Sequence, residues 1–381
     1  MSAYVGVGNL ARKVKSIYVG VGDLARKVKK GYIGIGGVAR PFFGMEGELE
    51  YYGTITPLSQ ARSELAATTV GNYALFAGGT YEEKSDKVDV YQSNLAKSNN
   101  LSLRDAVSLL SATTVGNYAL FAGGVEYIGR PWGAVNAFNN SLVRVNVESD
   151  LSVDRYNLAA TTVGNYALFA GGYGGDDPDT YHVENEVNSY NSSLVRGHPA
   201  LLSSERQKLA ATTVGGYALF AGGCNRNGNT FYSTVDYYNT SLTRSTATSL
   251  RTGRYSLAAT SVGDYALFAG GIDNSPCDEV DIFNRNLVIT SPTAALRRPR
   301  FGLAATTVGD YAVFGGGGGY LNLGSYDQID IYNTNLMHDT GMSLSDYRRD
   351  LAATTVGNYA LFGGGSLSEE FKNTVDAYVV T

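Results

Sequence analysis

Residues 158–172 read LAATTVGNYALFAGG, and this stretch decides the fold because the chain repeats it with few changes. Seven copies occur, and their closing glycine pairs lie 45 to 51 residues apart. A period of this size is typical of repeat architectures, in which each repeat forms one structural unit that packs against its neighbours. The copies begin at Leu65, Leu110, Leu158, Leu209, Leu257, Leu303 and Leu351.

Each copy has the sequence of a β-hairpin. A short apolar and β-branched run is followed by two turn residues and then by Tyr-Ala-Leu-Phe or a close variant. The first turn residue is always Gly, and the second is Asn, Asp or Gly, the types that best tolerate a positive φ. Two-residue hairpin turns of the primed types use that conformation. We therefore expect a strand, a tight turn and a second strand in every copy.

Two further strands are expected after each glycine pair. Alternating segments such as 235–238 and 329–332 predict a third strand, and a near-constant turn such as 239–242 follows it. A weaker fourth strand then leads into a Leu-x-x-x-Arg-x-x-Leu pattern that precedes the next copy. Four strands per repeat predict one blade of a β-propeller.

At these positions the chain resembles the Kelch-repeat family. The shared features are the glycine pair that ends the second strand, the aromatic residue in the third strand and the Arg upstream of the first strand. The resemblance covers residues 47–381 and implies an all-β, seven-bladed Kelch-type β-propeller. Kelch blades usually carry a Trp after the third strand, where this chain has a smaller apolar residue that can also fill the gap between blades, namely Leu142, Leu194, Leu242, Leu287 and Leu336.

The order of segments predicts how the ring closes. The seventh repeat stops after its third strand, at residues 375–381, and lacks a fourth strand. Residues 49–56 precede Leu58 and Arg62 in the way that every other fourth strand precedes its lead-in. We expect this N-terminal strand to complete the last blade and so to remove the exposed sheet edge.

Residues 1–46 form a second module with a repeat of its own, AYVGVGNLARKVKS, IYVGVGDLARKVKK and GYIGIGGVARPFFG. Each unit predicts a small hairpin around a Gly-Asn, Gly-Asp or Gly-Gly turn. Residues 1–44 hold eight Lys or Arg and one acidic residue, so their formal charge is +7. The net charge of the whole chain is −5, so the remaining residues carry −12. Three short hairpins bury little core, so we expect the module to need binding partners, such as copies of itself.

These tandem units resemble segments at the front of structural and tail-fibre proteins of phages that infect Gram-positive bacteria. The resemblance implies that the module docks the protein onto a virion or forms a homo-oligomeric stalk. The basic residues could hold nucleic acid, but a solvated strand face is the favoured interpretation. The Gly-x-Gly pairs do not indicate a nucleotide site, because no helix is predicted after them.

Composition limits the cellular setting. With 44% hydrophobic residues, 47 Gly and 8 Pro, the chain suits many short strands joined by tight turns. It has no run of eighteen apolar residues and does not begin like a signal peptide, so we expect synthesis in a bacterial cytoplasm and no membrane insertion. The resemblance of the N-terminal units to phage proteins implies a final place on the virion, bound to virion or tail proteins. Cys224 and Cys277 are interpreted as two separate thiols, with a disulfide between adjacent blades as the alternative.

The sequence predicts no catalytic centre, metal site or cofactor. A reaction centre should break the repeat symmetry, but His182, His198 and His338 fall in different repeats without metal-ligand spacing. The lead-in Arg recurs in six repeats, with Val107 as the exception, and is interpreted as structural. We expect each to bond a backbone group or the third-strand Asp of its blade. The arginines are Arg62, Arg155, Arg206, Arg254, Arg300 and Arg348, and the aspartates are Asp89, Asp236, Asp281, Asp330 and Asp376.

The loop between the second and third strands does break the symmetry, and it is long in repeats two, three and four. In this topology these loops share one face of the ring with the connections into the first strands, as expected of a scaffold that presents binding loops. Aromatic rings flanked by Asn, Asp and Arg suit sugars, which stack on rings and form planar hydrogen bonds. The candidate ligand-binding residues are Tyr127, Arg130, Trp132, Tyr173, Asp177, Tyr181, Asn227 and Tyr232.

One of these loops is acidic and has two interpretations. A cluster of carboxylates can hold calcium, but the spacing here matches no calcium-loop pattern and favours a solvated, flexible loop. The residues are Asp176, Asp177, Asp179, Glu184 and Glu186.

The leading functional hypothesis is a non-enzymatic, virion-associated recognition protein, such as a phage or prophage tail fibre or appendage. Its propeller loops would bind a receptor on the host surface, a glycan in the first place and a protein in the second. The alternative is a structural or protein-interaction propeller that decorates a capsid or tail.

Overall fold

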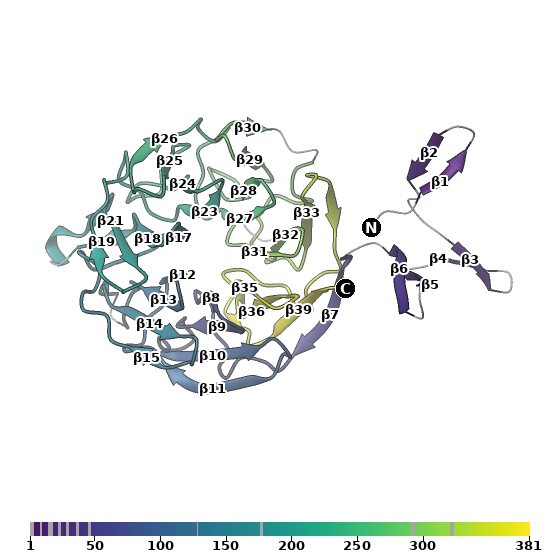
Figure 1. Cartoon of the computed structure of the whole chain (residues 1–381). Helices are drawn as coiled ribbons and strands as arrows, with labels where there is room; N and C mark the ends of the chain where they lie inside the picture. The colour runs from purple at the N-terminus through teal and green to yellow at the C-terminus, as the bar shows by residue number, and fades with distance from the viewer. Residues whose placement is uncertain are drawn as a thin grey trace. The chain divides into compact units, whose positions relative to one another are not determined.

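The computed structural model describes all residues except 1–3, 8–9, 14–17, 22–23, 28–29, 36–37, 45–46, 128, 176–177, 291–293 and 321–323. The chain divides into two compact units, Met1–Leu49 with Val380–Thr381 and Glu50–Val379. The larger unit has an all-β, propeller-like fold, in which small antiparallel sheets are arranged around a centre (Figure 1).

The first unit consists of hairpins, as its repeat predicts. Within each pair the strands are antiparallel, and the Tyr-Val-Gly-Val segment faces Leu-Ala-Arg-Lys, with Val5 opposite Arg12 and Val19 opposite Arg26. The described strands are β1 (Tyr4–Val7) with β2 (Leu10–Lys13), β3 (Tyr18–Val21) with β4 (Leu24–Lys27), and β5 (Lys30–Ile35) with β6 (Val38–Gly44).

The described residues of the larger unit contain seven four-stranded antiparallel sheets. Each first strand lies nearest the centre and packs against the first strand of the next sheet, and β35 packs in the same way against β8 (Figure 1). The first strands are β8 (Ala66–Val70), β12 (Ser111–Val115), β17 (Ala159–Val163), β23 (Ala210–Val214), β27 (Ala258–Val262), β31 (Ala304–Val308) and β35 (Ala352–Val356).

The second strands carry the Tyr-Ala-Leu-Phe segment and pair with the first strands as hairpins. They are β9 (Tyr73–Ala77), β13 (Tyr118–Ala122), β18 (Tyr166–Ala170), β24 (Tyr217–Ala221), β28 (Tyr265–Ala269), β32 (Tyr311–Gly315) and β36 (Tyr359–Gly363). The third strands are β10 (Lys87–Gln92), β14 (Val135–Asn139), β21 (Val187–Asn191), β25 (Val235–Tyr238), β29 (Val280–Asn284), β33 (Ile329–Asn333) and β39 (Val375–Val380).

The fourth strands are shorter, apart from the first and the last in this series. They are β11 (Lys97–Ser102), β15 (Arg144–Val145), β22 (Arg196–Gly197), β26 (Arg244–Thr246), β30 (Ile289–Thr290), β34 (His338–Thr340) and, beside β39, β7 (Leu49–Ile55). Short pieces in the loops complete the fold, namely β16 (Arg155–Tyr156), β19 (Tyr173–Gly174), β20 (His182–Val183), β37 (Ser366–Leu367), β38 (Glu370–Phe371) and the 3-10 turn η1 (Pro178–Thr180).

The hairpin turns between first and second strands differ from the prediction in one detail. Gly164 has a φ of 54° and its equivalents lie close to that value, but the Asn or Asp that follows is not in the positive-φ region. A turn of the II′ type needs positive φ only at its first central residue. The preference for Asn or Asp at the second position is therefore not a requirement of the backbone, and only Gly216 has positive φ there.

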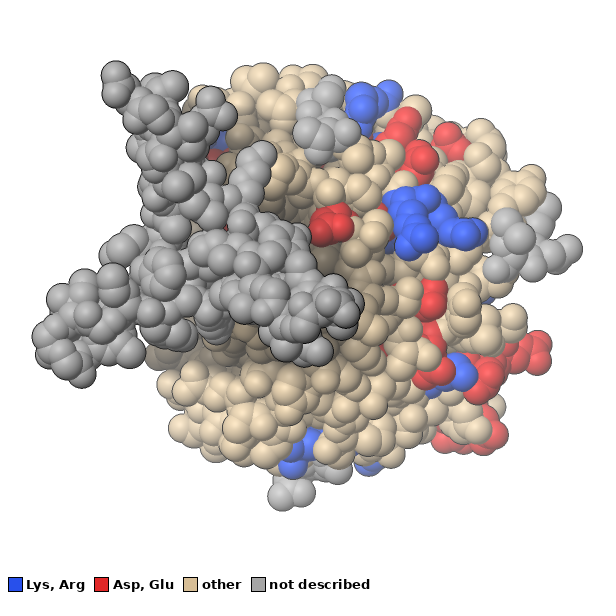
Figure 2. Space-filling model, turned by 90° about the vertical axis from the view of Figure 1, so that its right-hand side faces the viewer, with Lys and Arg blue, Asp and Glu red and all other residues tan. Residues whose placement is uncertain are grey.

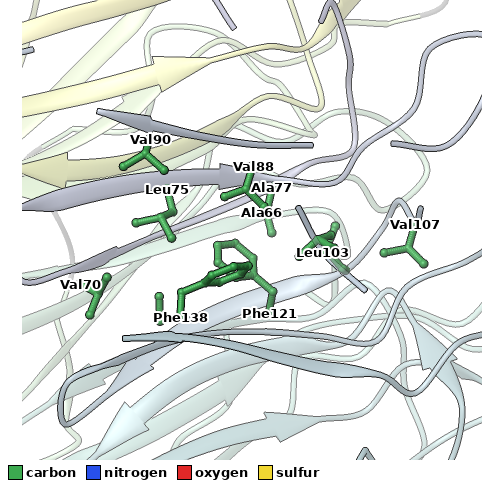
Figure 3. Close-up of a cluster of buried hydrophobic side chains, with 12 residues drawn as sticks. Ala66, Val70, Leu75, Ala77, Val88, Val90, Leu103, Val107, Phe121 and Phe138 are labelled. Atoms are coloured by element: carbon green, nitrogen blue, oxygen red, sulfur yellow. The ribbon is translucent and has the colours of Figure 1, made fainter. Parts of the chain in front are cut away.

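Apolar side chains between neighbouring sheets form the core. In the cluster between the first two sheets, Leu75 and Val88 meet Phe121 and Phe138, whose rings are 6.1 Å apart in an edge-to-face arrangement (Figure 3). Leu142 packs against this cluster. The Leu that follows the third strand therefore fills the space between two sheets, as predicted.

The repeated arginines have the structural role that the sequence predicts. Their side chains are fully buried, and five of them reach the third-strand Asp of the same sheet with nitrogen–oxygen distances of 2.5 to 2.8 Å. The guanidinium groups also donate to the carbonyl of the second-strand Phe, as Arg206 does to Phe220 at 3.0 Å. Each pair therefore fixes a lead-in segment to its own sheet.

Two repeats depart from this pairing. The second has Val107 and Asn136 in place of Arg and Asp, so both charges are lost together. The third keeps Arg155 but faces it with Asn188, whose side-chain oxygen accepts a hydrogen bond of 2.9 Å. Burial lowers the pKa of Arg155 to about 10, while the nearby Glu184 acts in the opposite direction.

Candidate functional site

The loops that vary between repeats lie on the same face as the lead-ins to the first strands. The two strands of each hairpin are antiparallel, so the segment before the first strand and the segment after the second strand meet at one end of the sheet. Cross-strand pairs join them, such as Tyr255 with Ile272 and Gln207 with Cys224. We call this surface the variable face.

The loop of the second repeat places three of the predicted binding residues together. Tyr127 is 74% exposed, and the Arg130 guanidinium lies 5.5 Å from the centroid of the Trp132 ring. Trp132 itself is half-buried against the core of the first two sheets, and its indole nitrogen donates to Asp105 at 2.8 Å. Trp132 therefore supports its loop, while Tyr127 and Arg130 are more exposed than Trp132, whose role in ligand binding stays a prediction.

The loop of the third repeat contributes an aromatic cluster. Tyr173 lies between Tyr156, with ring centroids 5.6 Å apart, and Tyr181, with centroids 6.4 Å apart. Arg226 from the next repeat lies over the Tyr173 ring at 5.6 Å. The sequence singled out Tyr173 and Tyr181 but missed Tyr156 and Arg226, which join the cluster from separate segments.

The loop of the fourth repeat is held by its own polar groups. The Asn225 side-chain oxygen accepts hydrogen bonds from the backbone nitrogens of Asn229 and Thr230. The predicted residue Asn227 is exposed near the tip of this loop, and Tyr232 is half-buried at its end. The remaining predicted residue, Asp177, lies outside the described residues.

The acidic loop differs in part from the predicted solvated segment. Glu184 is buried, with one carboxyl oxygen 3.2 Å from the Nε2 atom of His182. Burial raises the pKa of Glu184, while His182 and Arg155 act to lower it. Glu184 therefore lies beside the one lead-in Arg that faces Asn, whereas Asp176 and Asp177 lie outside the described residues and calcium binding stays untested.

Backbone hydrogen bonds run around the centre of the variable face. The residue before each repeated Leu donates its N–H to the carbonyl of its counterpart in the preceding repeat, and Glu64 donates to Asp350 of the last repeat, at distances of 2.8 to 3.1 Å. All seven have φ between 53° and 59°, a region that non-glycine residues seldom occupy. They are Glu64, Leu109, Asn157, Lys208, Ser256, Gly302 and Asp350.

These seven residues line a cavity of about 650 Å³, a size typical of small-molecule sites. The repeated Leu residues also line it, together with Tyr255, Phe301 and Arg349. We call it the axial cavity. Every repeat contributes to it, but with a different side chain at the equivalent position.

Charged groups in the axial cavity include Glu64, Lys208, Arg349 and Asp350. Burial raises the pKa of Asp350 to about 6; Glu64 acts in the same direction, while Arg349 and Lys208 oppose it. The Asp350 side chain keeps 39% of its surface exposed, so a ligand can reach the carboxyl group and solvent screening limits its effect on stability.

The axial cavity was not predicted, although the sequence carries a signal for it. The two residues between the lead-in Arg and the Leu vary from repeat to repeat, while the residues around them are nearly constant. Variation at a fixed position within a strict repeat indicates a site that each repeat shapes differently.

Three further observations concern metal-ligating groups, membrane-spanning helices and surface charge. Within the described ranges, no group of three or more His, Cys, Asp or Glu could hold a metal ion. In the same part of the chain, no helix is long and apolar enough to cross a membrane. Where Figure 2 shows described residues, basic and acidic groups lie close to one another rather than forming a patch of one sign.

Comparison with known proteins bears on the fold alone. No family model matches the chain, and no curated protein matches it. Among solved structures, one titled "Structure of YjhT" is similar, with a TM-score of 0.57, 13% sequence identity, and coverage of 86% of this chain and 96% of that one. At this identity the likeness supports a common propeller-like architecture and says nothing of activity.

Proposed function

We propose that the larger unit is a closed seven-bladed Kelch-type propeller in which β7 completes the last blade. The hydrogen bonds around the axial cavity support this, because the bond from Glu64 to Asp350 joins the first repeat to the last. So does the last sheet, where the Tyr51 hydroxyl donates to Asp376 at 2.7 Å and the Tyr51 ring lies 5.1 Å from Tyr378.

We further propose that the chain is a non-enzymatic recognition protein of a phage or prophage particle, and that its variable face binds a host-surface glycan. One observation carries this proposal: the repeats differ in chemistry on one face only. On the other face the turns are nearly identical, as where the side chains of Asn191, Asn239 and Asn333 accept the same pair of backbone hydrogen bonds. A purely structural ring has no need for such contrast.

The chemistry of the variable face suits sugars. Tyr127 offers an exposed ring, and Arg130 and Arg226 lie over aromatic rings with their guanidinium groups available for planar hydrogen bonds. Sugar rings stack on aromatic faces, and their hydroxyls bond to groups of this kind.

The hairpin unit at residues 1–44 is the proposed attachment module. Its charge of +7 contrasts with the acidic remainder, and its two-stranded sheets are of a size that is marginal in isolation. We propose that it binds virion or tail proteins or forms a homo-oligomer.

Two measurements test the proposal. Electron microscopy of particles labelled with an antibody against residues 47–381 should place the protein on virions, and a glycan array probed with the full chain should show binding to a restricted set of glycans. Virion labelling without glycan binding would favour the alternative, a propeller that decorates a capsid or tail. Absence of labelling would overturn the virion assignment.

A further inference from the structure

We propose that the axial cavity is a second binding site, and that it takes a zwitterionic ligand the size of a sugar residue, with an ammonium group at one end and a carboxylate or phosphate at the other. The inference deepens the proposed function, because it assigns a ligand class to the centre of the same face.

The charges of the cavity are unevenly placed, because Arg349 lies beside Asp350 while the other base, Lys208, comes from a distant repeat. In the order of the backbone hydrogen bonds, Asp350 and Glu64 are neighbours, and Lys208 is three steps from either of them. Lys208 therefore lies across the cavity from the two carboxylates. Two acids and two bases line the cavity, so its charges sum to zero while its ends have opposite sign.

At the acidic end the carboxylates are only partly compensated. Ser108 donates to Glu64 at 2.9 Å, and Lys84, from outside the cavity lining, donates to the same Ser108 hydroxyl. Arg349 directs its guanidinium over the Phe301 ring at 5.7 Å, and its Nε atom is 3.5 Å from Asp350, too long for a good hydrogen bond. A ligand ammonium would supply the missing positive charge, mainly to Asp350.

Gly302 leaves room for the Asp350 carboxylate. A Cβ atom at residue 302 would lie 2.6 Å from the Asp350 Oδ1 atom, and the φ of 59° is itself unfavourable for other residue types. Among the seven equivalent residues, the glycine therefore lies at the position next to the Asp350 carboxylate, where a side chain would collide with it.

At the basic end, Lys208 forms no ion pair among the described residues. Its ammonium lies 5.6 Å from the centroid of the Tyr255 ring, and the residue is exposed to the cavity. An anionic ligand group can therefore bind Lys208 without displacing a protein carboxylate. Between the two ends, Tyr255 and Phe301 line the cavity, and their ring edges can contact the apolar face of a sugar.

Four probes of similar size separate the charge requirements: glucosamine 6-phosphate with both charges, glucosamine with the positive charge, glucose 6-phosphate with the negative charge, and glucose with neither. Calorimetric titration of the full chain at pH 7 and low salt should show glucosamine 6-phosphate binding at least tenfold more tightly than each of the others.

Matched variants assign the two ends. Lys208→Met should reduce the affinity for glucosamine 6-phosphate to that for glucosamine, and Asp350→Asn should reduce it to that for glucose 6-phosphate. Glu64→Gln should lower the affinity in the same way but by less. Val195→Ser, at an exposed turn position on the opposite face, should leave the affinity for all four probes unchanged. Melting curves check that each variant is folded.

The inference is overturned if no probe binds, if all four bind equally, or if the two variants leave the charge preference unchanged. These outcomes leave the proposed function unaffected. The glycan array tests glycan binding by the full chain, and particle labelling tests its place on the virion. Conversely, tight binding of glucosamine 6-phosphate without attachment to any particle would uphold the cavity site and contradict the virion assignment.

Discussion

At the scale of single residues, buried Arg–Asp pairs determine how the lead-in segments hold to their sheets. The sequence predicted these pairs because the two residue types recur at fixed spacing. It did not predict that Arg155 would face Asn188 with Glu184 nearby, because the loop that carries Glu184 differs from all the others. Repeated contacts can be read from a repeat, whereas a compensating contact in a unique loop requires the structure.

Asp236→Asn should destabilise the ring by about 3–5 kcal/mol, because it leaves Arg206 charged and buried without a carboxylate. The double variant Arg206→Met/Asp236→Asn should recover part of the loss, since the second repeat lacks both charges naturally at Val107 and Asn136. Urea unfolding measures both. A double variant less stable than the single one would contradict this explanation of the pairs.

Asp350 gives a pH dependence of known sign. The pKa of Asp350 in the folded state is about 6, above the usual value of about 3.9. The folded state therefore binds this proton more tightly than the unfolded state does. As a result, the contribution of Asp350 to the free energy of unfolding rises as the pH falls from above 6 to below 4. Asp350→Asn should therefore be slightly more stable than the parent chain at pH 7.5, and the difference should shrink by pH 4.5. Thermal melting at the two pH values tests this, and a difference that grows on acidification would refute it.

At the scale of elements, the glycine turns and the alternating segments predicted the first three strands of each repeat, and the structure has these strands. The glycine at the first turn position requires positive φ, and Gly164 and its equivalents have it. The role of Trp132 was not predictable, because the sequence cannot tell whether a loop side chain folds back onto its own sheet. Its hydrogen bond to Asp105 and its contact with the core explain why Tyr127 is the better probe of binding.

β7 gives a test at this scale. Deleting residues 1–57 removes β7 together with the Tyr51 contacts to Asp376 and Tyr378, and exposes the edge of β39. We expect this truncation to melt well below the full chain, while deletion of residues 1–44 leaves the melting temperature of the ring nearly unchanged. Equal melting of the two truncations would show that β7 does not close the last blade.

At the scale of the whole molecule, the period of the repeat predicted the propeller-like fold, but the axial cavity was not predicted, although the positions that line it vary between repeats. Its lining comes from all seven repeats, and residues that are far apart in sequence meet there only in the folded chain. Lys208 and Gly302 line this cavity, but neither belongs to a sequence motif that would identify it as part of a site.

Assembly is also a property of the whole chain. Because three short hairpins bury little apolar surface, we expect residues 1–44 to associate, most simply as a trimer. Light scattering should give a larger particle for the full chain than for residues 45–381. Two monomers, together with no binding of the full chain to virions, would contradict the proposed role of the hairpin unit.

The most direct test of the central claim compares the two faces of the ring in one attachment assay. Cells or arrayed glycans that bind the full chain are probed with Tyr127→Ala on the variable face and with Val195→Ser, at an exposed turn position on the opposite face. We predict that Tyr127→Ala weakens attachment by about 1–3 kcal/mol with an unchanged melting temperature, while Val195→Ser binds like the parent chain. Equal effects of both substitutions, or weakening by Val195→Ser alone, would show that recognition does not reside on the variable face.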